Sequence, residues 1–275
     1  MTISVLGPLQ VTVGGRPVAL PAKQRTLLAV LAFHVNRTVP QHRLVEAGWG
    51  EDASAGLVKT LQSHMFQLRR ALVDEAAVGE PRIVTDAGGY RLEADPACVD
   101  ARLFMRLLEA ARADGSEPHA KIALLQRALG MWRGPGVADV GDEPAVLAEI
   151  QQLEWLRLSA VEDLARLRLA VGEHELVVPE LRRALAETPY NEQLWASLMI
   201  ALARCGKRAE ALIAFQQART ALRVELDIEP GRELQELALH LREGDRVDTL
   251  AMGTPGPPPT PPMTSGAREA TVQAC

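Results

Sequence analysis

The side chains best suited to bind another molecule lie in one short stretch, residues 58–72. Lys59, Thr60, Ser63, Gln67 and Arg70 follow one another there at spacings of one to four residues, with no acid in the stretch. Cations bind phosphate oxygens, and short hydroxyl or amide side chains on a rigid rod can bind base edges. These residue types predict a surface that contacts nucleic acid. An ordinary helix with a solvated charged face is the alternative for this stretch taken alone.

The apolar residues of the same stretch predict the element that holds this surface. They are spaced 3, 4, 3 and 4 residues apart, which at about 3.6 residues per turn forms one stripe along a helix. The polar residues then lie on the opposite flank, where a DNA major groove could receive them. The members of the stripe are Val58, Leu61, Met65, Leu68 and Leu72.

The segments around this helix predict how it is mounted. Alternating apolar residues predict short strands within residues 1–20, with a tight hairpin turn at Gly14-Gly15. Pro21 can open a helix that extends to about residue 35, because the first helical N–H has no partner. A second short helix is expected over about residues 41–47, before the helix of residues 58–72.

Two short strands are expected after that helix, at residues 83–85 and 90–92. They are joined through Asp86-Ala87-Gly88-Gly89. A sheet, three helices and a β-hairpin are the order of a winged helix-turn-helix of the response-regulator type. In that plan the third helix reads the major groove and the hairpin is the wing. We therefore predict a winged helix-turn-helix DNA-binding domain over residues 1–95.

The predicted fold class is α+β followed by all-α. From residue 96 to residue 247 helical periodicity dominates, and Gly172, Leu181 and Ala184 recur 34 residues later as Gly206, Phe215 and Ala218. A 34-residue period is typical of tetratricopeptide helix pairs. We therefore predict a tetratricopeptide-like helical domain. The Pro-rich residues 248–275 are predicted to be disordered, because they have no apolar face.

Charge and composition narrow the function. Residues 1–72 hold eight Lys or Arg and three acids, a net charge of +5, whereas the whole chain has −5. This asymmetry favours a DNA-binding N-terminal domain. Lys23 and Arg25 are left open as a surface pair or as phosphate ligands.

Other chemistry finds little support in the sequence. No spacing of His or Cys predicts a metal site, and no nucleophile and base can be assembled, so no metal, cofactor or enzymatic activity is predicted. The three cysteines lie far apart, no apolar run reaches the length of a bilayer, and Met1-Thr2-Ile3-Ser4 carries no secretory signal. The expected location is the cytoplasm.

Several short motifs, in order along residues 3–245, together resemble the Streptomyces antibiotic regulatory protein family. In the N-terminal part they are Leu6-Gly7-Pro8-Leu9, Ala22-Lys23-Gln24-Arg25, Asn36-Arg37, Trp49-Gly50, Thr60-Leu61-Gln62 and Leu68-Arg69-Arg70-Ala71-Leu72. Later ones are Leu129 with Trp132-Arg133-Gly134-Pro135, then Asp142-Glu143-Pro144, and Glu225-Leu226-Asp227-Ile228-Glu229-Pro230-Gly231. The family joins a winged helix to a bacterial transcriptional activation domain, which here would be residues 96–247.

The resemblance implies an activator of a secondary-metabolite (antibiotic) gene cluster. Such an activator would bind tandem direct repeats in double-stranded promoter DNA as side-by-side protomers, and would recruit RNA polymerase holoenzyme with its sigma subunit. The alternative is a tetratricopeptide-like adaptor or ligand sensor whose winged helix pairs with protein.

The resemblance also assigns roles along the predicted recognition helix. Thr60, Ser63 and Gln67 are candidates for base contacts, and Gln67 could pair bidentately with adenine. Phe66 is expected to touch a thymine methyl or to pack on the wing. Arg69 is expected either to bind phosphate or to pair internally with an acid. The acid at the wing tip, Asp86, opposes insertion of the wing into a minor groove, so Arg91 is the candidate phosphate contact of the wing. The other candidates for phosphate contacts are Lys59, His64 and Arg70.

Overall fold

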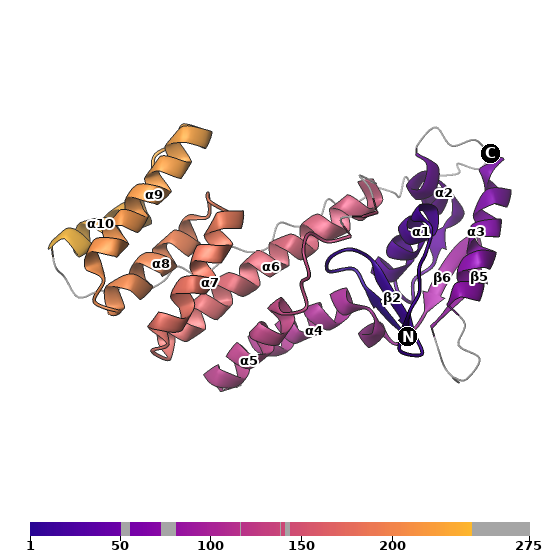
Figure 1. Cartoon of the computed structure of the whole chain (residues 1–275), viewed down its shortest axis with the longest axis horizontal. Helices are drawn as coiled ribbons and strands as arrows, with labels where there is room; N and C mark the ends of the chain where they lie inside the picture. Colours follow the sequence, from indigo (N-terminus) through magenta and orange to yellow (C-terminus); the bar gives the residue numbers. More distant parts are fainter. Residues whose placement is uncertain (51–55, 73–80, 116, 138, 141–143, 244–275) are drawn as a thin grey trace, which may run out of the picture.

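The computed structural model describes residues 1–50, 56–72, 81–115, 117–137, 139–140 and 144–243 (Figure 1). It begins with an antiparallel sheet in the order β1-β2-β3, formed by β1 (Thr2–Ser4), β2 (Gln10–Val13) and β3 (Arg16–Pro17). Gly14 and Gly15 have φ values of 55° and 76°, as the predicted hairpin turn requires. The return strand is shorter than predicted, although the Val18 N–H still donates to the Val11 carbonyl over 2.9 Å.

Three helices follow as predicted: α1 (Ala22–Phe33), α2 (Gln41–Trp49) and α3 (Leu57–Ala71). Every residue of α1 from Thr26 to Phe33 is buried, because α2, α3 and the later helix α6 (Pro144–Ala170) all contact it. The stripe of α3 is buried against this centre: Leu61, Met65 and Leu68 are fully enclosed. The amphipathic periodicity of residues 58–72 is therefore confirmed.

The wing is a three-stranded sheet rather than the expected two-stranded hairpin. The predicted strands are present as β5 (Arg82–Asp86) and β6 (Gly89–Glu93), and a short strand β4 (Val39–Pro40) pairs with β6, giving the order β4-β6-β5. β4 passes so close to Gly89 that a Cβ atom there would lie 2.1 Å from the Val39 carbonyl oxygen. Glycine is thus required at position 89 by a close backbone approach.

The rest of the described chain is helical, as predicted. A 3-10 turn (Pro96–Cys98) precedes the helices, which are arranged along α6 and extend away from the winged domain (Figure 1). Gly172 and Gly206, one predicted period apart, occupy the turns after α6 and α8 with φ values of 86° and 75°. The helices besides α6 are α4 (Asp100–Arg112), α5 (Pro118–Leu129), α7 (His174–Glu187), α8 (Glu192–Arg204), α9 (Arg208–Leu226) and α10 (Arg232–Glu243).

The boundary between the two apolar cores does not coincide with the change from mixed α and β structure to all-helical structure near residue 96. One core runs from Ile3 through the winged helix, α4 and α5 to Leu164 in α6, and a second runs from Ala165 to Leu241. The winged helix therefore shares its core with the first helical hairpin. The division at residues 95 and 96 remains a prediction about domains, and the predicted disorder of the tail concerns residues outside the described ones.

Polar contacts reinforce this shared core at the loop of residues 5–9. The Asp100 carboxylate accepts the backbone N–H groups of Val5 and Leu6 over 2.7 and 3.2 Å. The Arg133 N–H donates to the Leu6 carbonyl over 2.9 Å, and the Leu9 N–H donates to Asp139 over 2.8 Å. Burial raises the pKa of the Asp100 carboxyl, although its two backbone hydrogen bonds lower it. The N-terminal sheet is thereby fastened to the helical domain.

Replacing Asp100 by Asn should lower the free energy of unfolding by about 1–3 kcal/mol, because the amide offers one acceptor oxygen where two backbone N–H groups need one each. Urea unfolding followed by circular dichroism measures this. Asp114, exposed in the turn after α4, is the matched control, and Asp114→Asn should change stability by less than about 0.5 kcal/mol. Equal effects of the two variants would contradict the role of Asp100.

Candidate nucleic-acid interface

The outward flank of α3 brings together most of the predicted contact residues. The exposed side chains on it include Thr60, Ser63 and Gln67, which are spaced about one turn apart. Phe66 is 60% exposed, which does not favour the alternative that it packs on the wing. Gln62 is also exposed and was missed as a candidate, although its amide could bind base edges in the same way as that of Gln67. The exposed cations on this helix are Lys59 and Arg70.

The position of α3 leaves this flank accessible. Figure 1 shows the helix at the edge of the winged domain, on the side away from α7 to α10. Its buried stripe faces α1, α2 and β5. The polar flank is therefore directed outward from the molecule, as a groove-binding helix requires.

His64 lies partly inward, at the junction of α3 with α2. Its ring is half-buried and lies 5.5 Å from the Trp49 ring, at an interplanar angle of 52°. Its Nδ1 atom is buried and has no hydrogen-bond partner among the described residues. A contact between His64 and phosphate would therefore have to use Nε2, so the structure assigns this residue a packing role as well.

Among the described residues, Arg69 finds its partners on the wing. Its Nε donates to the Ile83 carbonyl over 2.7 Å and its Nη2 to the Thr85 hydroxyl over 2.8 Å. Its guanidinium carbon also lies 5.7 Å from the centre of the Tyr90 ring, within range of a cation–π contact. The internal alternative is favoured, but the partner differs from the expected one. Arg69 holds β5 against α3.

Arg91, the predicted phosphate contact of the wing, is paired within the wing itself. Its guanidinium forms ion pairs with Asp86 over 3.2 Å and with Glu93 over 2.7 Å. Hydrogen bonds lower the pKa of both carboxyls, mainly from Thr38 to Asp86 and from Arg82 to Glu93. Both acids thus stay charged at neutral pH and compensate the Arg91 charge. Arg91 is therefore part of the wing's internal ion-pair network, and its phosphate contact stays a prediction.

The acid at the wing tip has a structural explanation. Asp86 accepts a hydrogen bond from the Thr38 hydroxyl over 2.6 Å and one from the Ala87 N–H over 2.8 Å. Thr38 directly precedes β4, so Asp86 ties the turn of the wing to the segment that leads into α2. This function explains why a residue that phosphates would repel stands at this position.

The first turn of α1 holds three polar residues that the sequence left without a definite partner. The Lys23 ammonium donates to the Gly48 carbonyl and lies 6.0 Å from the centre of the Trp49 ring. Gln24, which is 5% exposed, donates from Nε2 to the Gln67 Oε1 atom over 2.7 Å. Arg25 pairs with Asp139 of the helical domain. Lys23 is exposed and Arg25 half-buried, and each binds another part of the protein; the choice between a surface pair and phosphate ligands stays open.

A signal for these contacts was present in the sequence but was not specific. Three consecutive polar residues after Pro21-Ala22, at the start of an otherwise apolar helix, indicate side chains that leave the core in different directions. Their partners lie 25, 43 and 114 residues further along the chain. Helical periodicity carries no information about contacts at that range.

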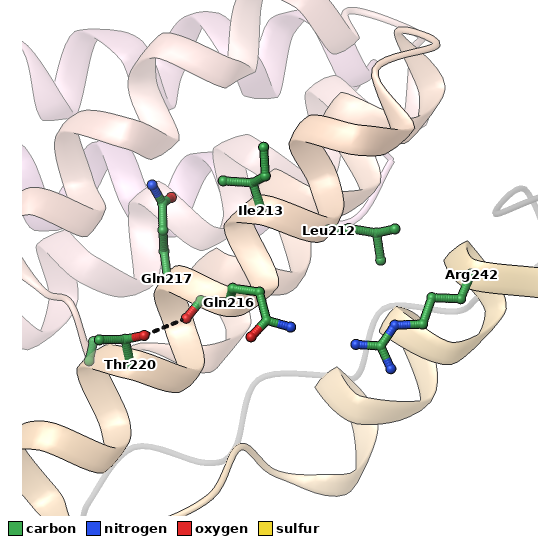
Figure 2. Close-up of a pocket in the computed structure, with 7 residues that line it drawn as sticks. Leu212, Ile213, Gln216, Gln217, Thr220 and Arg242 are labelled. Atoms are coloured by element: carbon green, nitrogen blue, oxygen red, sulfur yellow. Dashed lines mark hydrogen bonds between the residues drawn. The ribbon is translucent and has the colours of Figure 1, made fainter.

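The helical domain has a groove at its far end. Leu212, Ile213, Gln216, Thr220 and Arg242 line a hollow of about 690 Å³ that is open to solvent between α9 and α10 (Figure 2). The only hydrogen bond drawn between its lining residues joins the Thr220 hydroxyl to the Gln216 carbonyl over 2.9 Å. Apolar and amide groups dominate this groove, so it offers surface for contact rather than groups for catalysis.

Among the described residues, no group of three or more His, Cys, Asp or Glu side chains is placed to hold a metal ion. Among the helices placed by the structure, none combines the length and the apolar character needed to cross a bilayer.

Known protein families match both parts of the chain. The family model of the bacterial transcriptional activator domain matches residues 99–242, and that of the C-terminal part of transcriptional regulatory proteins matches residues 15–92. Regulatory protein DnrI of Streptomyces peucetius is 34% identical over 245 residues, which cover 86% of this chain and 90% of DnrI. Transcriptional regulator RedD of Streptomyces coelicolor is 32% identical over 251 residues, which cover 89% and 71%.

A solved structure has the same architecture. That of Mycobacterium tuberculosis EmbR in complex with a low-affinity phosphopeptide matches with a TM-score of 0.80 and 30% sequence identity. The match covers 90% of this chain and 66% of the EmbR chain. The winged domain and the helical domain thus occur together in a related protein.

Replacing Arg69 by Ala should lower the free energy of unfolding by about 1–3 kcal/mol, because it removes two charged hydrogen bonds and a cation–π contact between α3 and the wing. The neighbouring Arg70 lies on the exposed flank, so Arg70→Ala should change stability by less than about 0.5 kcal/mol. Urea unfolding of the two variants measures the difference. An equally stable Arg69→Ala protein would mean that the wing does not depend on this side chain.

Proposed function

The chain belongs to the Streptomyces antibiotic regulatory protein family of DNA-binding transcriptional activators, and from this premise we propose that it places the outward flank of α3 in the major groove of promoter DNA. One observation carries the proposal: that flank has no acid, is exposed, and lies at the edge of the molecule. A helix on a rigid support, with its apolar stripe buried, can enter the groove without reorganising.

The contact residues divide into two groups by chemistry. We assign Thr60, Ser63 and Gln67 to base edges, because short hydroxyl and amide groups read hydrogen-bond patterns in the major groove. Lys59 and Arg70 are assigned to phosphates, which set affinity and register rather than sequence. Phe66 is positioned to touch a thymine methyl, and His64 to reach a phosphate through Nε2.

The wing contributes mainly by holding α3. Both described cations of the wing strands are paired, Arg91 with Asp86 and Glu93 and Arg82 with Glu93. Asp86 also occupies the start of the wing tip, so insertion into a minor groove is not favoured. Ala87 and Gly88 at the turn are exposed and carry no bulky side chain. We propose that this turn lies beside the DNA backbone.

The biological setting is proposed from family membership. The protein would act in the cytoplasm and activate a secondary-metabolite gene cluster. It would bind tandem direct repeats as side-by-side protomers and recruit RNA polymerase holoenzyme with its sigma subunit. The fastening of the N-terminal sheet to the helical domain supports this arrangement, because a DNA-bound winged helix would hold the helical domain in a defined direction.

A tetratricopeptide-like adaptor or ligand sensor is the second candidate, favoured by the open groove of about 690 Å³ between α9 and α10. In that case the winged helix would pair with protein. The two candidates differ in how binding to duplex DNA responds to salt.

The affinity for promoter DNA that carries direct repeats should fall steeply as salt is raised, with a slope of roughly 0.9 log unit per phosphate contact per log unit of salt. A gel-shift titration with promoter fragments from the neighbouring gene cluster measures this slope. The matched control is a fragment of the same length with scrambled repeats, which should bind more weakly at every salt concentration. Absent or salt-independent binding would favour the adaptor.

Gln67→Ala and Arg70→Ala should affect binding in different ways. Removing the amide should relax the preference at one base pair, by the equivalent of about 1–3 kcal/mol of discrimination. Removing the cation should weaken binding to all sequences alike and reduce the salt slope by about one contact. Competition binding with single-base variants of the promoter distinguishes a loss of base preference from a uniform loss of affinity. A uniform loss in both variants would show that the division into base and phosphate contacts is wrong.

A further inference from the structure

Gln24 is a buried polar residue whose only described side-chain partner lies on the DNA-facing helix. It sits in the first turn of α1, is 5% exposed, and donates from Nε2 to the Gln67 Oε1 atom over 2.7 Å. The helix that carries it is held in the core, where Leu27, Leu28 and Leu31 are fully buried. The hydrogen bond therefore connects a rigid element to the one amide that we assign to base contacts.

A second contact from the first turn of α1 also supports α3. Lys23 binds the Gly48 carbonyl and lies over the Trp49 ring, which packs against His64 of α3. Two adjacent residues of α1 thus reach α3, one directly and one through Trp49. The position of α3 relative to α1 is fixed at both places, so the Gln67 amide is oriented by the protein before DNA binds.

The direction of the hydrogen bond determines what Gln67 can offer. A side-chain amide has one acceptor oxygen and an NH2 group with two donors. Since the oxygen of Gln67 is turned towards α1 by Gln24, its NH2 group is the part presented to the groove. A group that only donates fits guanine best, because guanine offers two adjacent acceptors, N7 and O6. The expectation from sequence was adenine, whose bidentate contact needs the amide oxygen as well.

We propose that Gln24 is a positioning residue that holds the Gln67 amide as a hydrogen-bond donor, so that the protein selects guanine at the base pair facing Gln67. This inference rests on the proposed function, because it requires α3 to lie in the major groove. It adds to that function a residue that does not touch DNA but determines which base is chosen.

To test this, the full chain and its variants are each used to select binding sites from a randomised duplex DNA library. Gln67→Ala identifies the base pair in question, as the one whose preference it abolishes. Gln24→Met keeps a similar side-chain shape but removes the donor, so the guanine preference there should fall about tenfold, as expected for the loss of one good base contact. Gln24→Glu can only accept, so the Gln67 amide should turn round and prefer adenine or cytosine, which present amino donors.

Ala22→Glu is the matched control for the added charge. It places the same carboxylate on an exposed position of the same turn. It should weaken binding to all sequences alike and leave the guanine preference unchanged. Melting temperatures of all variants show whether each one folds, and Gln24→Met alone is decisive where Gln24→Glu does not fold.

The outcomes separate this inference from the proposed function. Gln24→Met and Gln24→Glu could both bind DNA in a salt-dependent way and keep the guanine preference. That result would overturn the role of Gln24 and leave the proposed function standing. A preference for adenine in the unmodified chain at the pair identified by Gln67→Ala would overturn the assigned amide direction. If the unmodified chain selects no DNA from the library, the proposed function fails and this inference fails with it.

Discussion

The burial of the α3 stripe is the constraint on which the rest of the structure depends. Leu61, Met65 and Leu68 are fully enclosed, and each such side chain contributes about 1.5–3 kcal/mol through removal from water. Because side chains three and four residues apart share one face of a helix, fixing this stripe in the core also fixes the opposite flank in solvent. The outward direction of Thr60, Ser63 and Gln67 follows from apolar packing and needs no bound DNA.

In addition to apolar packing, polar contacts fix the position of α3 and of the elements around it. Arg69 joins α3 to the wing, Asp86 joins the wing to Thr38, and Lys23 and Gln24 join α1 to α2 and α3. Several cationic side chains of the basic N-terminal domain therefore bind other parts of the protein. The net charge of +5 over residues 1–72 overstates what is available to phosphates, and the exposed cations of α3, Lys59 and Arg70, carry more of the proposed contact.

The sequence was informative wherever the determinant is local. Apolar spacing predicted α3 to within a residue at each end, and Gly14-Gly15 predicted its turn, because periodicity and positive φ are properties of neighbouring residues. β4 was missed because it has only two residues and exists through its pairing with β6. The partners of Arg69, Arg91 and Arg25 were missed for a related reason: a guanidinium can bind phosphate, carbonyl or carboxylate, and only the fold shows which of them is near.

The fastening of the N-terminal sheet to the helical domain gives the molecule its second organising feature. The apolar core crosses the predicted domain boundary, and Asp100, Arg133 and Asp139 hold the loop of residues 5–9 across it. A winged helix bound to DNA would then set the direction in which α7 to α10 extend. This coupling links the two parts that family membership assigns to DNA binding and activation.

The central claim is that the acid-free flank of α3 is the surface that meets the duplex. The most direct measurement is a cryo-EM or crystal structure of the full chain bound to promoter DNA. Our account predicts that α3 lies in the major groove, with Thr60, Ser63 and Gln67 facing base edges and Arg69 still bound to the wing. A complex in which this flank faces solvent or protein, while another surface contacts the DNA, would contradict it.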